Sequence, residues 1–471
     1  MSTPTSGLAL PLSLLTATAT ALAAALATTL VAAPDATATA EKPRPGPELT
    51  DFGYRADAYG VKLVTDNVEA FDVKDAHAQL RCTRAVGQSA QRSSAVSVPG
   101  NPLVHVAAST SRTDTYKDGN RHGVRGVNTI GDLRIGGTVN GVATPSLVIE
   151  GLTTTADAFH TPQGFGHAES FDFARIRLEL LAGTQLQGTP LEQLLAPLDQ
   201  VTATVFEGTN DAANPVFEVL RSATAPVQIP GLGSIALGKV RGKASSKRAT
   251  SEAMALEIVV DAGGSRQLVE IGSANARIGA PAPAGVFRAG GTALDFQALQ
   301  GALRFGGVQH KSLPCEGTLG RTQTFRVPSA SVLFGLLADL RDVTYTHRGS
   351  QDAGRDFAKG LTGTRIDTVS VPGVGLEIRG VESSVRMRGK ERKPVRARVA
   401  TTITSITMDG QPVAVPAPGG TTELPDGAGL VQRQLVKRSR YGARVIALRV
   451  TLFQHAVVMD LGLSDGHIYP R

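Results

Sequence analysis

The stretch ALRVTL (447–452), followed after five residues by VMDLGLSDGHI (458–468), has a close counterpart earlier in the chain. The counterpart is ALEIVV (255–260) followed by LVEIGSANARI (268–278), and the residues between its halves, DAGGSRQ, are typical of a turn. Apolar side chains alternate along all four segments, which is the periodicity of a half-buried strand. Each pair therefore predicts a β-hairpin, and the two hairpins together predict an internal duplication.

Further matches occur in the same order along the chain. Cys82 corresponds to Cys315, Gly151 to Gly380, and LLAGTQL (180–186) to TMDGQPV (407–413). The offsets are 233, 229 and 227 residues, and they fall to 192 at the hairpins. Copy one thus carries an insertion of about 35 residues within 187–254.

These matches predict the domain organisation. We expect a signal peptide at 1–40, a Pro-rich spacer at 41–50, copy one at 51–282 and copy two at 287–471, with IGAPAPAGVF (278–287) marking the boundary. The predicted fold is mainly β, with two tandem β-sandwich-like units related by a pseudo-twofold axis. Alternation at 170–180 and 375–390 supports strands, whereas leucines at helical spacing predict one or two short packing helices, at 189–201 and at 330–340.

The N-terminal segment points to export. An apolar stretch rich in Ala and Thr precedes Ala38-Thr39-Ala40, a small-x-small pattern that fits signal cleavage; an uncleaved membrane anchor is the alternative, because no Lys or Arg precedes the stretch. The chain has a formal net charge of +7, which favours anionic partners such as cell-wall polymers or acidic polysaccharides, although a merely soluble basic surface is equally compatible. We expect a secreted or cell-envelope location and no stable membrane span after cleavage.

The closing motif YGARVIALRVTL … VVMDLGLSDGHI and the opening ADAYGVKLV (56–64) resemble the choice-of-anchor P family of exported actinobacterial proteins. That resemblance implies a secreted or surface protein without assigned chemistry, so it supplies no catalytic residues. Members of that family carry variable C-terminal anchors, whereas this sequence ends in GHIYPR without a sorting motif. Free secretion or non-covalent association is the resulting expectation.

Motifs for catalysis, metals and cofactors are not found in the sequence. The nine histidines form no HExxH or Cys-His cluster, and neither a Gly-x-Ser-x-Gly elbow nor a P-loop is present. The stretch 157–170 gathers Asp157, His160, His167 and Glu169 in one predicted hairpin loop, which is either a metal or acid–base site or an ordinary solvated loop. We therefore predict no catalytic residue, metal or cofactor.

A cationic run lies in copy two. Seven basic residues fall within thirteen positions: Arg386, Arg388, Lys390, Arg392, Lys393, Arg396 and Arg398. On strands flanking a turn, alternate side chains share a face, so several of these cations would converge on a polyanion; an ordinary charged hairpin is the alternative. No aromatic residue occurs nearby in the sequence, which argues against recognition of single-stranded nucleic acid.

The two cysteines occupy equivalent repeat positions in a chain expected to be exported. An even cysteine count in that setting predicts a Cys82–Cys315 disulfide, with two buried thiols as the alternative. Two functions then remain open. One is a secreted, non-enzymatic structural or adhesive protein, and the other is an extracellular hydrolase or carbohydrate-active protein with a site at the copy-one insertion.

Overall fold

The computed structural model describes residues 48–65, 68–94, 104–139, 142–180, 204–208, 226–229, 233–262, 265–298, 303–308, 310–332, 338–352, 354, 356–390, 393–453 and 456–469. Antiparallel strands account for most of these residues, and no α-helix occurs among them. Two 3-10 turns, η5 (Pro372–Val374) and η6 (Pro425–Gly427), interrupt the strands. The prediction of a mainly β protein is confirmed.

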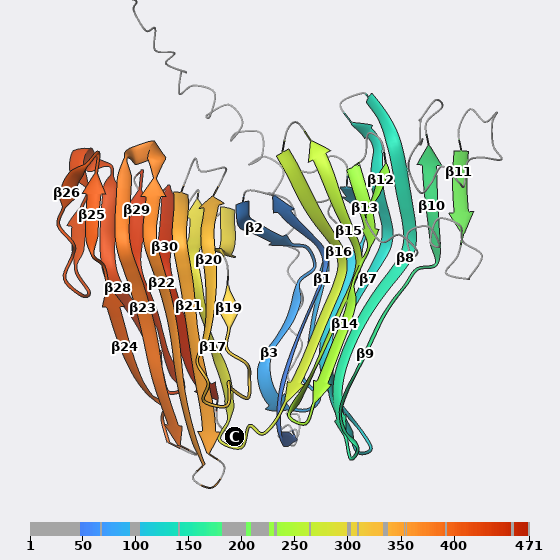
Figure 1. The fold of residues 1–471 in the computed structure, drawn as a ribbon, viewed down its shortest axis with the longest axis horizontal. Helices are drawn as coiled ribbons and strands as arrows, with labels where there is room; N and C mark the ends of the chain where they lie inside the picture. Colours follow the sequence, from blue (N-terminus) through green and yellow to red (C-terminus); the bar gives the residue numbers. More distant parts are fainter. Residues whose placement is uncertain are drawn as a thin grey trace, which may run out of the picture. The chain divides into compact units, whose positions relative to one another are not determined.

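Residues 49–279 form two sheets, coloured blue to yellow-green in Figure 1. Sheet A has the spatial order β12-β13-β15-β16-β1-β2, with β14 paired to β15 and β3 paired to β1. Its strands are β1 (Leu49–Thr65), β2 (Val68–Lys74), β3 (Ala78–Ala85), β12 (Val227–Ile229), β13 (Gly233–Leu237), β14 (Val240–Ser245), β15 (Arg248–Ala262) and β16 (Ser265–Gly279).

Sheet B holds the strands that lie between these in the sequence. Its order is β11-β10-β8-β7-β6-β4, with β5 paired to β7 and β9 paired to β8. Its strands are β4 (Ser89–Ser94), β5 (Val104–Val106), β6 (Ser109–Asp118), β7 (Arg121–Val139), β8 (Val142–Thr161), β9 (Gly164–Asp172), β10 (Arg175–Leu180) and β11 (Thr204–Gly208).

Residues 286–469 form the other two sheets, coloured yellow to red in Figure 1. Sheet C has the order β18-β17-β30-β29-β28-β27, with β19 paired to β17. Its strands are β17 (Val286–Ala298), β18 (Leu303–Val308), β19 (Lys311–Ser312), β27 (Thr421–Glu423), β28 (Gly429–Ser439), β29 (Gly442–Leu452) and β30 (Val457–Tyr469).

Sheet D has the order β20-β21-β22-β23-β25-β26, with β24 paired to β23. Its strands are β20 (Gln323–Val332), β21 (Ala338–Asp352), β22 (Phe357–Val371), β23 (Leu376–Lys390), β24 (Arg396–Thr402), β25 (Ser405–Met408) and β26 (Gln411–Val413). In each half of the chain, therefore, the first and last strands share one sheet and the middle strands form the other.

The two predicted hairpins are confirmed. Strand β15 pairs with β16 through Ile258↔Val269, and β29 pairs with β30 through Val450↔Met459. Gly272 in β16 and Gly462 in β30 both have positive φ values, 60° and 59°. Both strands are therefore locally irregular at the same position of the two similar sequences. Glycine adopts a positive φ there without the strain that a side chain would cause.

The predicted helix at 330–340 is wrong at every described position. Ala330 belongs to the end of β20 and Leu340 to the start of β21, and the two residues are register partners in an antiparallel pair. A short run of apolar residues fits both the helical and the strand periodicity. Here the pairing of β20 with β21 makes this run the ends of two strands instead of a helix. The helix predicted at 189–201 lies outside the described residues.

Aliphatic side chains make up most of the core between paired sheets, with a few buried Phe and Tyr rings. Along β23, Ile378, Val381, Val385 and Met387 are buried while most of the intervening residues are not. Polar contacts cross the interface between sheets C and D: the hydroxyls of Ser383 and Ser464 lie 2.7 Å apart, and Thr364 donates to the Leu463 carbonyl at 2.8 Å.

The segment between the halves is packed against the first half. The Ala282 amide donates to the Asp51 carbonyl at 2.9 Å, and the buried Arg84 donates to the Pro283 carbonyl at 3.3 Å. Arg277 and the buried Glu316 form an ion pair of 2.6 Å between β16 and the turn after β19. All these residues belong to one compact unit, Pro47–Arg471.

Candidate functional site

Four neighbouring strands of sheet D present cations on one face. Arg348 lies on β21, Lys359 on β22, Arg386 and Arg388 on β23, and Arg396 and Arg398 on β24. We call these six residues the cationic face. Each of them is exposed, whereas the residues between them, such as Met387 on β23, point into the core.

Strand register sets the spacing of the cationic face. Arg386 lies opposite Arg398, and Arg388 lies between Arg396 on one side and Lys359 on the other. Neighbouring strands are about 4.8 Å apart, and alternate residues on one strand are about 6.7 Å apart. The charges therefore form a lattice about 14 Å across, which matches repeated anionic groups better than a single ion.

No described carboxylate forms an ion pair with any residue of the cationic face. Like charges directly opposite each other on adjacent strands are destabilising. The one recorded ring contact is that of Arg388, whose guanidinium lies 5.3 Å from the centre of the Phe357 ring. The cationic face thus carries charge that the described part of the protein leaves unbalanced.

A shallow cavity of about 580 Å³ opens over this face. All six cations line it, together with Ser350, Gly360, Leu361 and Met387. The small side chain of Ser350 leaves room between the long side chains of Arg348 and Lys359, so a ligand can reach the sheet surface.

The opposite end of the same exposed sheet face has a different charge pattern. There Arg365 pairs with Asp367 at 2.8 Å, and Arg379 pairs with Glu377. Glu382 lies opposite Arg365 there, whereas Asp352 lies at the cationic end, opposite Phe357 and one register step beyond Ser350. The excess of cations is therefore local and is not a property of the whole sheet.

Four of the seven predicted binding residues meet in this cavity: Arg386, Arg388, Arg396 and Arg398. Lys390 is exposed one register step further along β23, and Lys393 is exposed in the turn that follows. Arg392 lies outside the described residues. Arg348 and Lys359 were not predicted, because they come from strands 27 to 50 residues earlier, and only the pairing of β21 and β22 with β23 brings them in.

No aromatic residue occurs near the cationic run in the sequence, but strand pairing brings the Phe357 ring to Arg388 from the neighbouring strand. Its side chain is half-buried. One aromatic ring of this kind provides no series of stacking platforms for successive bases.

The stretch 157–170 is part of a paired hairpin, and its interpretation as a loop is wrong. Its residues lie on β8 and β9, with Asp157 opposite Ala168 and Ala156 opposite Glu169, so Asp157 and Glu169 point to opposite faces. Asp157 is buried and accepts hydrogen bonds from Tyr116 at 2.8 Å and from Arg121 at 2.7 Å. Burial raises the pKa of the Asp157 carboxyl, while Tyr116 and Arg121 oppose that shift.

The other acidic and basic groups of this hairpin are also engaged. His167 and Glu169 form a pair of 2.8 Å, and a side chain at Gly242 of β14 would collide with both. His160 packs against Phe52, with ring centres 4.8 Å apart. Strand β14, which lies in the segment predicted as the copy-one insertion, therefore packs directly against the hairpin.

The predicted disulfide is confirmed. Cys82 in β3 and Cys315 in the turn after β19 are bonded, with Cα atoms 5.4 Å apart. The bond lies in a buried cluster with Ala282 and Val286, where the two halves of the chain meet.

Two kinds of feature are not found within the described residues. No group of three or more His, Cys, Asp or Glu residues there could hold a metal ion. No helix in that part of the chain has the length and apolar composition needed to cross a bilayer.

Comparisons with known proteins add no family assignment: no protein-family model matches this chain, and no curated protein is significantly similar to it.

Proposed function

We propose that this protein is a secreted, non-enzymatic structural or adhesive protein of the cell envelope, and that it binds an anionic polymer through the cationic face. One observation carries the proposal. Arg386 and Arg388 lie directly opposite Arg398 and Arg396, and no described acid pairs with any of the four.

The cost of that arrangement is the physical argument for a ligand. Four strands expose their cations on one side of the sheet, where mutual repulsion lowers the stability of the fold. A polyanion lying across the strands would remove the repulsion and release its own counterions, so binding would be favourable and dependent on salt. Specific recognition of nucleic acid is not part of the proposal, since base stacking would need more aromatic side chains.

Secretion rests on two supports. The first is the signal-like segment at the N-terminus, and the second is the disulfide, since such bonds persist in oxidising surroundings. The motif resemblance to the choice-of-anchor P family is compatible with this location, and we propose a relationship to that family.

We also propose that the two halves arose by duplication. Sheets B and D have corresponding strand orders. Strands β7 and β8 lie at the centre of sheet B, as β22 and β23 do in sheet D, and β9 pairs with β8 as β24 pairs with β23. Gly151 of β8 and Gly380 of β23 have φ values of 64° and 63°. At each glycine the neighbouring strand changes, from β9 to β10 and from β24 to β25.

A binding assay with fluorescently labelled polyphosphate tests the function. The double variant Arg386→Gln/Arg398→Gln should weaken binding about tenfold, or about 1.4 kcal/mol. It should also reduce the slope of log affinity against log salt by roughly 1.5, as expected for two lost phosphate contacts.

The matched control is Arg365→Gln/Arg379→Gln. It removes the same charge from the same sheet, but both arginines already have carboxylate partners. Nearly unchanged binding by this control supports a local site. Equal weakening by the two double variants, or binding that ignores salt, would show that the cationic face is not the site.

A further inference from the structure

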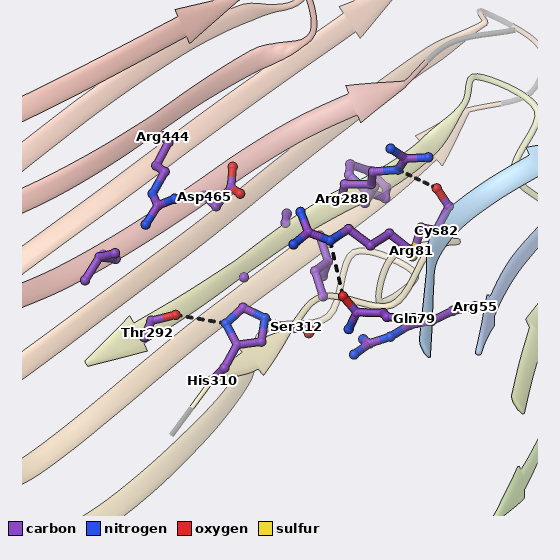
Figure 2. A pocket seen from close by; sticks show the side chains of 15 residues that line it. Arg55, Gln79, Arg81, Cys82, Arg288, Thr292, His310, Ser312, Arg444 and Asp465 are labelled. Carbon is purple, nitrogen blue, oxygen red and sulfur yellow. Dashed lines mark hydrogen bonds between the residues drawn. The ribbon is translucent and has the colours of Figure 1, made fainter. Parts of the chain in front are cut away.

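A second positively charged cavity lies beside the disulfide, and no residue of the cationic face lines it. Its volume is about 280 Å³, and its walls come from β1 and β3 of sheet A and from β17, β29 and β30 of sheet C. Figure 2 shows Arg55, Gln79 and Arg81 entering from the blue strands on one side, with Arg444 and Asp465 on the other. We call this cavity the junction pocket.

Guanidinium groups dominate its lining. Arg55, Arg81, Arg288 and Arg444 all contribute, whereas Asp465 is the one carboxylate among the lining residues. Asp465 is already engaged, because its Oδ1 lies 2.6 Å from Nδ1 of His467. Of the four arginines, Arg444 alone forms an ion pair with a described carboxylate, that of Asp295 at 3.8 Å.

The remaining three arginines form no ion pair with a described carboxylate. Arg81 uses its Nε to bond the Gln79 amide oxygen at 3.2 Å. For Arg55, burial is the main cause of a lowered pKa, and the charges of Arg277 and Arg81 add to it while Asp57 opposes it. Holding a partly desolvated guanidinium beside other cations costs free energy that an anion would recover.

Arg288 is held in a fixed orientation. Its Nε donates to the Cys82 carbonyl at 2.6 Å (Figure 2). Its guanidinium lies 4.3 Å from the centre of the Tyr469 ring. Its terminal nitrogens make no hydrogen bond within the described residues. A guanidinium locked in this way loses little entropy when it binds an oxyanion.

Neutral hydrogen-bonding groups complete the pocket. His310 lies between the hydroxyls of Thr292, at 2.9 Å, and Ser312, at 3.1 Å. Burial, with the charge of Arg55, lowers the pKa of His310 to about 4, so the ring is neutral at pH 7. Hydroxyl and imidazole groups of this kind suit a hydroxylated ligand, while Leu313 and Leu463 provide apolar wall.

We propose that the junction pocket binds a phosphate monoester carried on a small polyol or sugar. The number of guanidinium groups exceeds what one carboxylate would balance, and their forked geometry suits the oxygens of a phosphoryl group. The volume lies near the lower end for small-molecule sites and fits one such unit. The ligand is either a free phosphorylated compound or the terminal unit of a phosphate-containing polymer.

Isothermal titration with glycerol 3-phosphate tests the proposal on the full mature chain. Binding should be measurable for the phosphate ester and absent for glycerol. Arg81→Gln should weaken it about tenfold, and because the Arg81 side chain is exposed, this variant should fold. Arg55→Gln should weaken it further, with circular dichroism as the check on folding.

Controls separate this site from the cationic face. Arg365→Gln and Arg386→Gln/Arg398→Gln should leave the affinity for glycerol 3-phosphate unchanged. Arg81→Gln should in turn leave the larger part of polyphosphate binding intact. Equal affinity for glycerol, or an unchanged affinity in Arg81→Gln, would overturn the proposal without bearing on the cationic face.

A short glycerol-phosphate oligomer distinguishes the two sources. If the oligomer competes with glycerol 3-phosphate before phosphatase treatment but not after its terminal phosphate is removed, the pocket recognises polymer ends. Failure of the oligomer to compete while glycerol 3-phosphate binds assigns it to free compounds. Competition that survives phosphatase treatment contradicts recognition of a monoester.

Discussion

Arg386 on β23 and Arg398 on β24 are direct register partners with both side chains on the exposed face of sheet D. Two guanidinium groups placed in this way repel each other, and no described acid lies between them as a partner. The relationship links stability to binding, because any change that relieves the repulsion should also weaken a polyanion site.

Charge reversal at one member of this pair should have opposite effects on stability and binding. Arg398→Glu creates a cross-strand ion pair with Arg386, so we expect the free energy of unfolding to rise by about 0.2–1 kcal/mol. Affinity for polyphosphate should fall. Urea unfolding and the polyphosphate assay measure the two effects.

Thr402→Glu is the matched control on the same strand. It places a new carboxylate opposite Glu382, so it should lower the free energy of unfolding instead. If both variants stabilise the protein, the register argument fails.

The disulfide should be detectable as mass and as stability. The intact protein should weigh two daltons less than its reduced form and should resist alkylation until reduced. On the chain-entropy account, closing so long a loop contributes about 5.5 kcal/mol, so Cys82→Ser/Cys315→Ser should unfold at clearly lower denaturant concentration. Alkylation of both thiols without reduction would refute the bond.

Lowering the pH should destabilise the fold through His347. The ring is fully buried in β21, and burial lowers its pKa to about 4, against about 6.5 when unfolded. Below pH 6.5 the His347 ring binds a proton in the unfolded state but stays neutral in the folded state. The free energy of unfolding therefore falls until about pH 4 and then levels off. The loss for this one group is at most about 3 kcal/mol.

The variant His347→Gln identifies the source of that loss. Urea unfolding between pH 7 and pH 4 should show a smaller decrease in this variant than in the unchanged protein. His310 has a similarly lowered pKa, so some of the decrease should persist. An identical pH profile in the variant would remove His347 from the explanation.

The polar contact between sheets C and D should behave as a coupled pair. Ser464→Ala leaves the buried Ser383 hydroxyl without the 2.7 Å partner, and we expect a loss of about 1–3 kcal/mol. Ser383→Ala/Ser464→Ala should cost less than the sum of the single variants, because no hydroxyl is then left unpaired. Strict additivity in the double-mutant cycle would contradict a direct bond.

Gly151 and Gly380 should respond alike to substitution if the halves share their construction. Both have positive φ, and a Cβ would meet Ala174 at 2.8 Å in one case and collide with Thr404 in the other. Gly151→Ala and Gly380→Ala should each cost about 1–3 kcal/mol. Gly131→Ala is the control, since its nearest neighbour, Ala108, would be 3.9 Å away.

The parts of the fold that were predictable from the sequence are those marked by a local alternation of apolar residues or by a sequence pattern that occurs twice. Alternation along 375–390 gave β23, and the repeated pattern gave both hairpins and the cysteine pair. The error at 330–340 has the same origin, since leucines in an eleven-residue run fit a helix as well as two paired strand ends.

The two proposed binding surfaces were only partly predictable because pairing between distant strands builds them. Arg396 and Arg398 follow Arg386 closely in the sequence, so their convergence could be expected. Arg348 and Lys359 reach the same cavity through β21 and β22. The junction pocket offers no local signal at all, because Arg55, Arg81, Arg288 and Arg444 come from four strands spread over most of the described chain.

The Cys82–Cys315 bond has a mechanical consequence. Tension applied to residues on either side of it passes through the sulfur atoms, so the 233-residue loop between the cysteines carries none of the load. Fully extended, that loop would add about 800 Å of length. If the proposed adhesive function at a cell surface holds, the redox state of this one bond would decide whether the loop can extend under force.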